Sequence, residues 1–232
     1  MKKLVYLLCL LLAWGCQNNT NQSTVEEDHA ENHGHHHGHA NEHMNKRPFE
    51  ELVANFESPE RAEWQKPDSV IAFLGDLEGK TVMDIGSGTG YFSFRMAEAG
   101  ANVICADVDE RFLNYIAERR AEKGLTEAQV ETRKVPYDSS KLQENEADMV
   151  LIVNTYHHIE NREDYFAEIK RGLKPGGRLV VIDFRKEETP VGPPVEMKIT
   201  EEKVMDELRE AGFTDMQVNN DLLPYQYIIT AS

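Results

Sequence analysis

Cysteine is scarce in this chain: among its 232 residues, only Cys9, Cys16 and Cys105 are cysteines. Two of the three lie in the first sixteen residues, which leaves Cys105 without a partner for a disulfide within one chain. Cys105 lies in the apolar run NVICAD, so we expect a buried, unreactive thiol there. Because soft metals favour thiolate ligands, this scarcity also argues against such a metal in a folded core.

The chain has fewer basic than acidic residues. The chain has 25 lysines and arginines against 41 aspartates and glutamates, and its formal net charge at pH 7 is −16. A surface of this charge repels phosphate backbones, so we expect no nucleic-acid partner. Hydrophobic residues make up 40% of the chain, which is enough for one domain with a real core.

The apolar run near the N-terminus is short. LVYLLCLLLAW follows Lys2 and Lys3 and has about half of the ~20 residues that span a bilayer, which favours a secretory signal over a membrane helix. Gly15-Cys16 follows, and the segment resembles a bacterial lipoprotein signal, in which this cysteine is lipidated and becomes the mature N-terminus. We therefore expect residues 1–16 to be a signal and the protein to be anchored by lipid in the cell envelope, facing the periplasm. The alternatives are an uncleaved hydrophobic anchor and ordinary secretion.

Residues 17–45 are polar and rich in histidine. They hold too few apolar side chains to offset the entropy of ordering, so we expect a disordered tether. Seven of the nine histidines lie here, and imidazole is a good ligand for zinc or copper. A metal site is expected at the densest part, formed by His33, His35, His36, His37 and His39. The alternative is a flexible linker with adventitious metal binding.

Residues 46–232 have the pattern of a folded domain. Short apolar strands are expected at 81–86, 101–109, 129–135, 147–154, 178–184, 214–220 and 224–231. Helices are expected at 48–56, 68–77, 91–100, 110–123, 162–173 and 200–213, with a turn at KPGG between the helix at 162–173 and the next strand. Alternating strands and helices predict an α/β fold: a Rossmann-like, seven-stranded, mostly parallel sheet with helices on both faces. The last two strands have a short connection and should pair antiparallel, which gives an antiparallel C-terminal strand.

Three glycines follow the first of these strands in VMDIGSGTGYF. Gly86, Gly88 and Gly90 would form the turn from strand to helix, where missing Cβ atoms permit positive φ and close approach of a ligand. Asp107 ends the next strand about 20 residues further on, where a carboxylate can bind a ribose diol. The spacing is G-x-G-x-G, and Tyr91 stands where a dinucleotide fingerprint needs a small residue, which disfavours an NAD-dependent oxidoreductase.

Four segments in order, VMDIGSGTGYF, VICADVD, DMVLIVNTYHHI and LKPGGRLVVIDF, resemble the successive motifs of class I S-adenosylmethionine-dependent methyltransferases. The resemblance is strongest to small-molecule enzymes of the quinone-biosynthesis type. It implies S-adenosylmethionine as cofactor and roles for matching residues. Asp84 would hold the methionine ammonium group; Gly86, Ser87, Gly88 and Gly90 would line the methionine and ribose; Asp107 would bind the ribose hydroxyls, with Val108 beside the adenine; Asp138 would meet the adenine amine; and Asn154 would lie beside the transferable methyl.

Each of these roles has a plainer alternative. Asp84 and Asp107 are also explained as polar residues at strand ends, and Asp138 as a turn former. Trp64 and Gln65 would either cover the cofactor or cap the sheet.

Catalytic help is expected from the histidines of NTYHHIEN, which follow the fourth strand on the ligand side. Methyl transfer is an in-line displacement, so a base is needed only where the nucleophile carries a proton. We expect His157 or His158 to be that base, with His157 preferred. The alternative is that one histidine caps a helix and the other packs inside.

Two functions remain open from the sequence. The leading one is an enzyme that methylates a small or membrane-associated acceptor. The other is an envelope lipoprotein that binds metal through its tether and keeps a methyltransferase fold without activity. S-adenosylmethionine is made in the cytosol, which conflicts with an export signal, and the sequence leaves the oligomeric state open.

Overall fold

A computed structural model describes residues 47–232 of the chain. The expected signal, Cys16, the tether and its histidines lie outside the described residues. They stay predictions, and so does the boundary of the folded domain at residue 46.

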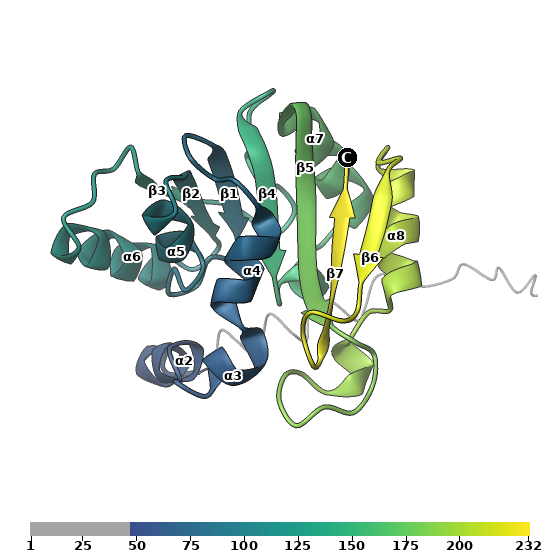
Figure 1. The fold of residues 1–232 in the computed structure, drawn as a ribbon, viewed down its shortest axis with the longest axis horizontal. Coiled ribbons are helices and arrows are strands. Elements are labelled where there is room, and N and C mark those ends of the chain that lie inside the picture. Colours follow the sequence, from purple (N-terminus) through teal and green to yellow (C-terminus); the bar gives the residue numbers. More distant parts are fainter. Residues whose placement is uncertain (1–46) are drawn as a thin grey trace, which may run out of the picture. The chain divides into compact units, whose positions relative to one another are not determined.

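A seven-stranded sheet forms the centre of the fold, in the order β3-β2-β1-β4-β5-β7-β6 (Figure 1). The strands are β1 (Thr81–Ile85), β2 (Asn102–Asp107), β3 (Val130–Lys134), β4 (Ala147–Val153), β5 (Leu173–Phe184), β6 (Met216–Asn219) and β7 (Gln226–Ala231). The first five strands pair in parallel, whereas β7 pairs antiparallel with both β5 and β6. The α/β prediction, with its mostly parallel sheet and antiparallel strand β7, is confirmed.

Helices cover both faces of this sheet. They are α2 (Phe49–Phe56), α3 (Arg61–Gln65), α4 (Pro67–Leu74), α5 (Ser93–Glu98), α6 (Glu110–Glu122), α7 (Arg162–Gly172) and α8 (Glu201–Glu210), with short 3-10 turns η1 (Tyr156–His158) and η2 (Val195–Met197). Successive strand residues enter different cores: Val82 and Cys105 pack with α4, α5 and α6, whereas Met83 and Ile104 pack with α7 and α8. This alternation buries both faces, which explains the nearly continuous apolar runs of β1, β2 and β4.

The expected turn at KPGG is wrong in detail, because these residues belong to β5. Leu173 pairs with Ala147 and Arg178 pairs with Met149, so residues 174–177 bulge out opposite Asp148. A Cβ on Gly177 would lie 3.0 Å from the carbonyl oxygen of Asp148, so the bulge needs a residue without a side chain there. Strand β5 therefore begins at Leu173, before the continuous apolar run that starts at Leu179.

The N-terminal helices α2 and α3 lie beside the ends at which β1 and β4 finish (Figure 1). This is the edge at which ligands bind in open α/β sheets. Among the described residues, no helix is long and apolar enough to cross a membrane.

Candidate functional site

The glycine turn follows β1 as expected, with φ of +70° at Gly86, +52° at Gly88 and +79° at Gly90. The space that their missing Cβ atoms leave is used by the protein itself. A Cβ on Gly86 would lie 2.3 Å from the Thr155 hydroxyl, and one on Gly88 would lie 3.2 Å from the ring of Phe56 in α2. The side chains of Thr155 and Phe56 therefore pack directly against the backbone of these glycines. The sequence predicted close approach of a ligand at this turn, but not these contacts within the protein.

Asp107 joins the end of β2 to this turn. Its carboxylate accepts hydrogen bonds from the backbone N–H of Gly88 at 2.9 Å and of Asp109 at 2.9 Å. Burial raises the pKa of Asp107 to about 6, although these hydrogen bonds act in the opposite direction. The two features expected to form the cofactor crevice are thus in direct contact, and a carboxylate has lone pairs left for a ribose.

Asp84 is the second buried carboxylate of the site and is 3% exposed. The Ser93 hydroxyl, at the start of α5, donates to it at 2.5 Å. Burial raises the pKa of Asp84 to about 6, with the Ser93 hydrogen bond and the charge of Arg61 opposing the rise. At neutral pH the group is ionised and has no cation within salt-bridge distance among the described residues.

Several polar atoms around the turn lack partners. In the described part of the chain, the Ser87 and Thr89 hydroxyls and the Arg61 Nε are buried without a hydrogen bond. A buried polar group left unpaired costs about 1–3 kcal/mol, and a polar ligand relieves that cost. These unpaired donors, together with the carboxylates of Asp84 and Asp107, fit a ligand that carries an ammonium group and a sugar.

Val108 and Asp138, the two residues expected to contact the adenine, have weaker structural support than Asp84 and Asp107. Val108 follows Asp107 directly and is partly buried against the core. Asp138 is exposed in a turn after β3, a position that the turn-former alternative explains equally well. Their roles toward an adenine stay predictions.

Asn154 directly follows β4, has a φ of +55° and belongs to a closed ring of three amides. Its Nδ2 donates to Gln65 at 3.2 Å, Gln65 donates to Gln226 at 2.8 Å, and Gln226 donates back to Asn154 at 2.5 Å. Gln65 and Gln226 are fully buried. The ring fixes α3 to the ends of β4 and β7, so Gln65 ties a helix to the sheet. Trp64 packs on Phe184, with ring centroids 5.6 Å apart.

The two histidines differ in environment. His157 Nδ1 lies 3.2 Å from Asp183 Oδ2, and the other oxygen of Asp183 accepts the backbone N–H of Phe184 at 2.8 Å. His158 stacks beside His157, with ring centroids 4.2 Å apart, and burial lowers its pKa to about 3. His158 is therefore neutral and a weak base at pH 7, whereas Asp183 can hold His157 with Nε2 free to accept a proton. The sequence analysis assigned residues 178–184 to a strand but gave Asp183 no role beside a histidine.

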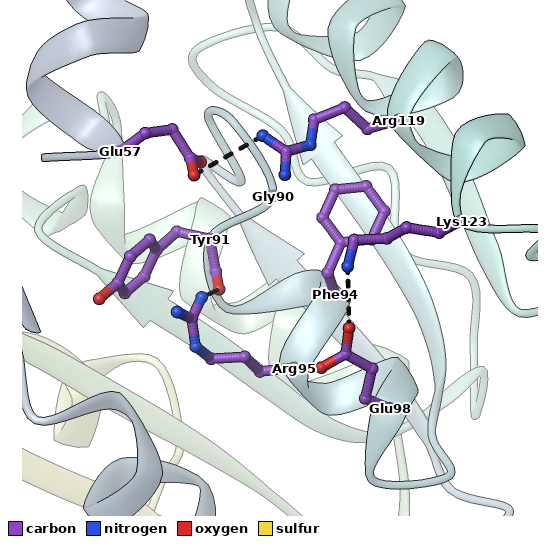
Figure 2. Close-up of a pocket in the computed structure, with 8 residues that line it drawn as sticks. All are labelled: Glu57, Gly90, Tyr91, Phe94, Arg95, Glu98, Arg119 and Lys123. Atoms are coloured by element: carbon purple, nitrogen blue, oxygen red, sulfur yellow. Dashed lines mark hydrogen bonds and ion pairs between the residues drawn. The ribbon is translucent and has the colours of Figure 1, made fainter. Parts of the chain in front are cut away.

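A polar cavity of about 190 Å³ lies beside Gly90 (Figure 2). Its lining residues are Glu57, Gly90, Tyr91, Phe94, Arg95, Glu98, Arg119 and Lys123. Its charges are largely paired, with Lys123 2.9 Å from Glu98 and Arg119 3.7 Å from Glu57. It is smaller than the ~300 Å³ at which ligand pockets usually begin. Of the residues expected to bind the cofactor, only Gly90 lines this cavity.

Within residues 47–232, no cluster of histidine, cysteine, aspartate or glutamate is arranged to hold a metal ion. The expected zinc or copper site on the tether lies outside the described residues and stays a prediction.

Comparison with known proteins agrees with this geometry. Residues 83–181 match the model of a methyltransferase domain family. A crystal structure of a SAM-dependent methyltransferase from Aquifex aeolicus is 29% identical, with a TM-score of 0.71, and the match covers 80% of this chain and 98% of that one. The chain carries a class I methyltransferase domain.

Curated relatives share this domain over part of their length. A ubiquinone/menaquinone biosynthesis C-methyltransferase from Ectopseudomonas mendocina is 30% identical over 128 residues, which are 52% of this chain and 48% of the relative. A tRNA U34 carboxymethyltransferase from Klebsiella pneumoniae is 30% identical over 137 residues, which are 59% of this chain and 40% of the relative. The chain spans less than half of either relative. The methyltransferase domain is thus common to proteins that are named for different acceptors.

Proposed function

We propose that the protein transfers a methyl group from S-adenosylmethionine to a small or membrane-associated acceptor. The observation that carries this proposal is the contact between Asp107 and the glycine turn, which also holds two buried hydroxyls without partners, in a chain that matches a methyltransferase domain. The relatives described above are named for ubiquinone and menaquinone biosynthesis and for tRNA U34. The net charge of −16 disfavours a polyanionic acceptor, so we favour the small molecule.

The glycine turn and the carboxylates of Asp84 and Asp107 would bind the cofactor. When bound, S-adenosylmethionine supplies a methyl group on a positively charged sulfur, and the sulfur is the leaving group of an in-line displacement. Asp84 would pair with the ammonium group and Asp107 would accept hydrogen bonds from the ribose. Ser87 and Thr89 would gain the partners that their buried hydroxyls lack. Burial of both carboxylates strengthens these contacts, because water competes less for them.

Proton removal from the acceptor is the role we assign to His157. Asp183 would keep the proton of the imidazole on Nδ1, so that Nε2 faces the acceptor as a base. His157 would take the proton that the nucleophilic atom of the acceptor loses when it receives the methyl group. We therefore infer an acceptor whose nucleophilic atom carries a proton.

Calorimetry with S-adenosylhomocysteine, the demethylated cofactor, tests this proposal on the full-length protein. We expect binding by the wild type and a loss of about tenfold or more in Asp107→Asn, because one charged hydrogen-bond acceptor contributes about 1.5–3 kcal/mol. Asp109→Asn is the matched control. It removes a neighbouring carboxylate whose side chain pairs with Arg111, and its affinity should stay within about twofold of the wild type. No binding by the wild type, or equal affinity in Asp107→Asn, would contradict the proposal.

We further propose that the protein is lipid-anchored in the cell envelope through Cys16, on the strength of the signal-like sequence before it. In cells fed with labelled palmitate, the wild type should carry the label and Cys16→Ser should not. Equal labelling, or none in the wild type, would overturn the anchor and leave the enzymatic proposal untouched.

A further inference from the structure

The 3-10 turn η1, which carries His157, is held at both ends by one buried ion pair. Where the turn begins, the hydroxyl of Tyr156 donates to Glu207 Oε2 of α8 at 2.5 Å. Directly after the turn, the carbonyl oxygen of Ile159 accepts from Arg162 Nη1 at 3.2 Å. Arg162 in turn binds the carboxylate of Glu207 twice, from Nε to Oε2 at 2.8 Å and from Nη2 to Oε1 at 3.1 Å. The two ends of the turn therefore share one support.

This support is buried and charged. The side chains of Arg162 and Glu207 are only 11% and 10% exposed. Burial raises the pKa of Glu207, but the hydrogen bonds from Arg162 and Tyr156 outweigh it, so the pKa lies below its ordinary value and the carboxylate is ionised at pH 7. The ring of Tyr156 is fully buried and stacks on Phe166 of α7, with ring centroids 5.0 Å apart. Two parallel, charge-assisted hydrogen bonds fix direction as well as distance, so α7 and α8 hold the turn in one orientation.

The contact between His157 and Asp183 depends on that orientation. The distance of 3.2 Å between His157 Nδ1 and Asp183 Oδ2 is at the upper end of the range for an N–H···O hydrogen bond. A further displacement of about 0.4 Å would break it. Because Tyr156 and His157 are adjacent in the turn, a shift of the Tyr156 backbone also displaces the imidazole. The proton would then no longer be held on Nδ1.

We propose that Glu207 is a positioning residue, which holds η1 through Tyr156 and Arg162 so that His157 keeps its hydrogen bond to Asp183 and presents Nε2 as a base. The inference rests on the proposed function, in which His157 takes the proton of the acceptor. It extends that function to α8, because Glu207 lies 51 residues after Tyr156 in the chain. A carboxylate in a helix thus determines which nitrogen of the base carries the proton.

Nitrogen-15 NMR of the histidine side chains at pH 8 tests this on the full-length protein, without cofactor or acceptor. The spectrum of His157→Gln identifies the signals of His157 by their loss. In the wild type we expect the proton of His157 on Nδ1 alone. Tyr156→Phe removes one hydroxyl and keeps the ring that stacks on Phe166. In this variant we expect a mixture of both tautomers, as for a histidine that has lost its hydrogen bond.

Lys203→Met is the matched control. Lys203 Nζ lies 3.5 Å from Glu207 Oε1, but its side chain is 60% exposed, and its loss leaves the hydrogen bonds from Tyr156 and Arg162 in place. The tautomer of His157 should stay as in the wild type. Glu207→Gln is the second variant. It keeps the size of the side chain and removes the charge that Arg162 binds, so it should also give a mixture of tautomers, and it decides the test if Tyr156→Phe does not fold.

The outcomes separate the inference from the function beneath it. A mixture of tautomers in the wild type overturns the role of Glu207 without any variant. A lower urea midpoint in Tyr156→Phe with the proton of His157 still on Nδ1 alone shows a structural role only and also overturns it, as does an equal tautomer change in Lys203→Met. Failure of the proposed function is seen in a different measurement, as a wild type that does not bind S-adenosylhomocysteine.

Discussion

The buried carboxylate of Asp84 should cost the protein stability, and Asp84→Asn should recover it. The pKa of Asp84 rises from an ordinary value of 3.8 to about 6, chiefly through burial. At 1.36 kcal/mol for each pKa unit, the ionised group disfavours the folded state by up to about 3 kcal/mol at pH 8. Asparagine has the same shape, and its carbonyl oxygen can still accept the Ser93 hydroxyl.

The raised pKa of Asp84 also predicts how the free energy of unfolding changes with pH. Between about pH 4 and pH 6, the folded wild type keeps a proton on Asp84 that the unfolded chain has lost, so its stability falls as the pH rises. Asp84→Asn has no such group, and the charge of Asp107 is only a minor cause of the raised pKa of Asp84. Urea unfolding at pH 4 and pH 8 should therefore show nearly equal stability at pH 4 and a variant more stable by up to about 3 kcal/mol at pH 8.

The same variant should bind S-adenosylhomocysteine about tenfold or more weakly, since the ammonium group loses its charged partner. A variant less stable than the wild type at pH 8, or a difference that does not change with pH, would refute the reasoning.

Three further results are expected. Gly86→Ala should lower the free energy of unfolding by about 2 kcal/mol or more, because its Cβ would meet the Thr155 hydroxyl at positive φ; an unchanged urea midpoint would contradict this. Nitrogen-15 NMR should find His157 protonated on Nδ1 in the wild type and on a mixture of both nitrogens in Asp183→Asn; one tautomer population in both proteins would remove the orienting role. Burial raises the pKa of Cys105 well above its usual range, so Ellman's reagent should label it only after unfolding, and rapid labelling of the native protein would oppose the structure.

Local patterns carried most of the fold prediction. A strand buried on both faces needs apolar side chains on both, and the nearly continuous apolar runs in β1, β2, β4 and the second half of β5 show this in the sequence. Helix starts are equally local: Asp109 and Thr200 cap α6 and α8 with their own side chains. The KPGG segment misled the sequence analysis because a bulge inside a strand uses the same residues as a turn.

The site was predicted where it is local and missed where it is not. Asp107 and the glycine turn follow strands in a recognisable order. Gln65 and Gln226, by contrast, are 161 residues apart and meet only because the end of α3 lies at the start of β7. The guanidinium of Arg61 likewise lies over the ring of Tyr91, 4.0 Å from its centroid, only in the folded chain. Contacts of this kind depend on tertiary packing, and no periodicity in the sequence reveals them.

The most direct test of the account is a crystal structure of the protein with S-adenosylhomocysteine bound. The account predicts the ribose hydroxyls within hydrogen-bond distance of Asp107, the ammonium group of the amino-acid part beside Asp84, and the sulfur directed toward Asn154. Phe56 should have moved off the glycine turn or should pack on the ligand. A complex with the ligand elsewhere, or with Asp107 still bonded only to backbone, would contradict it.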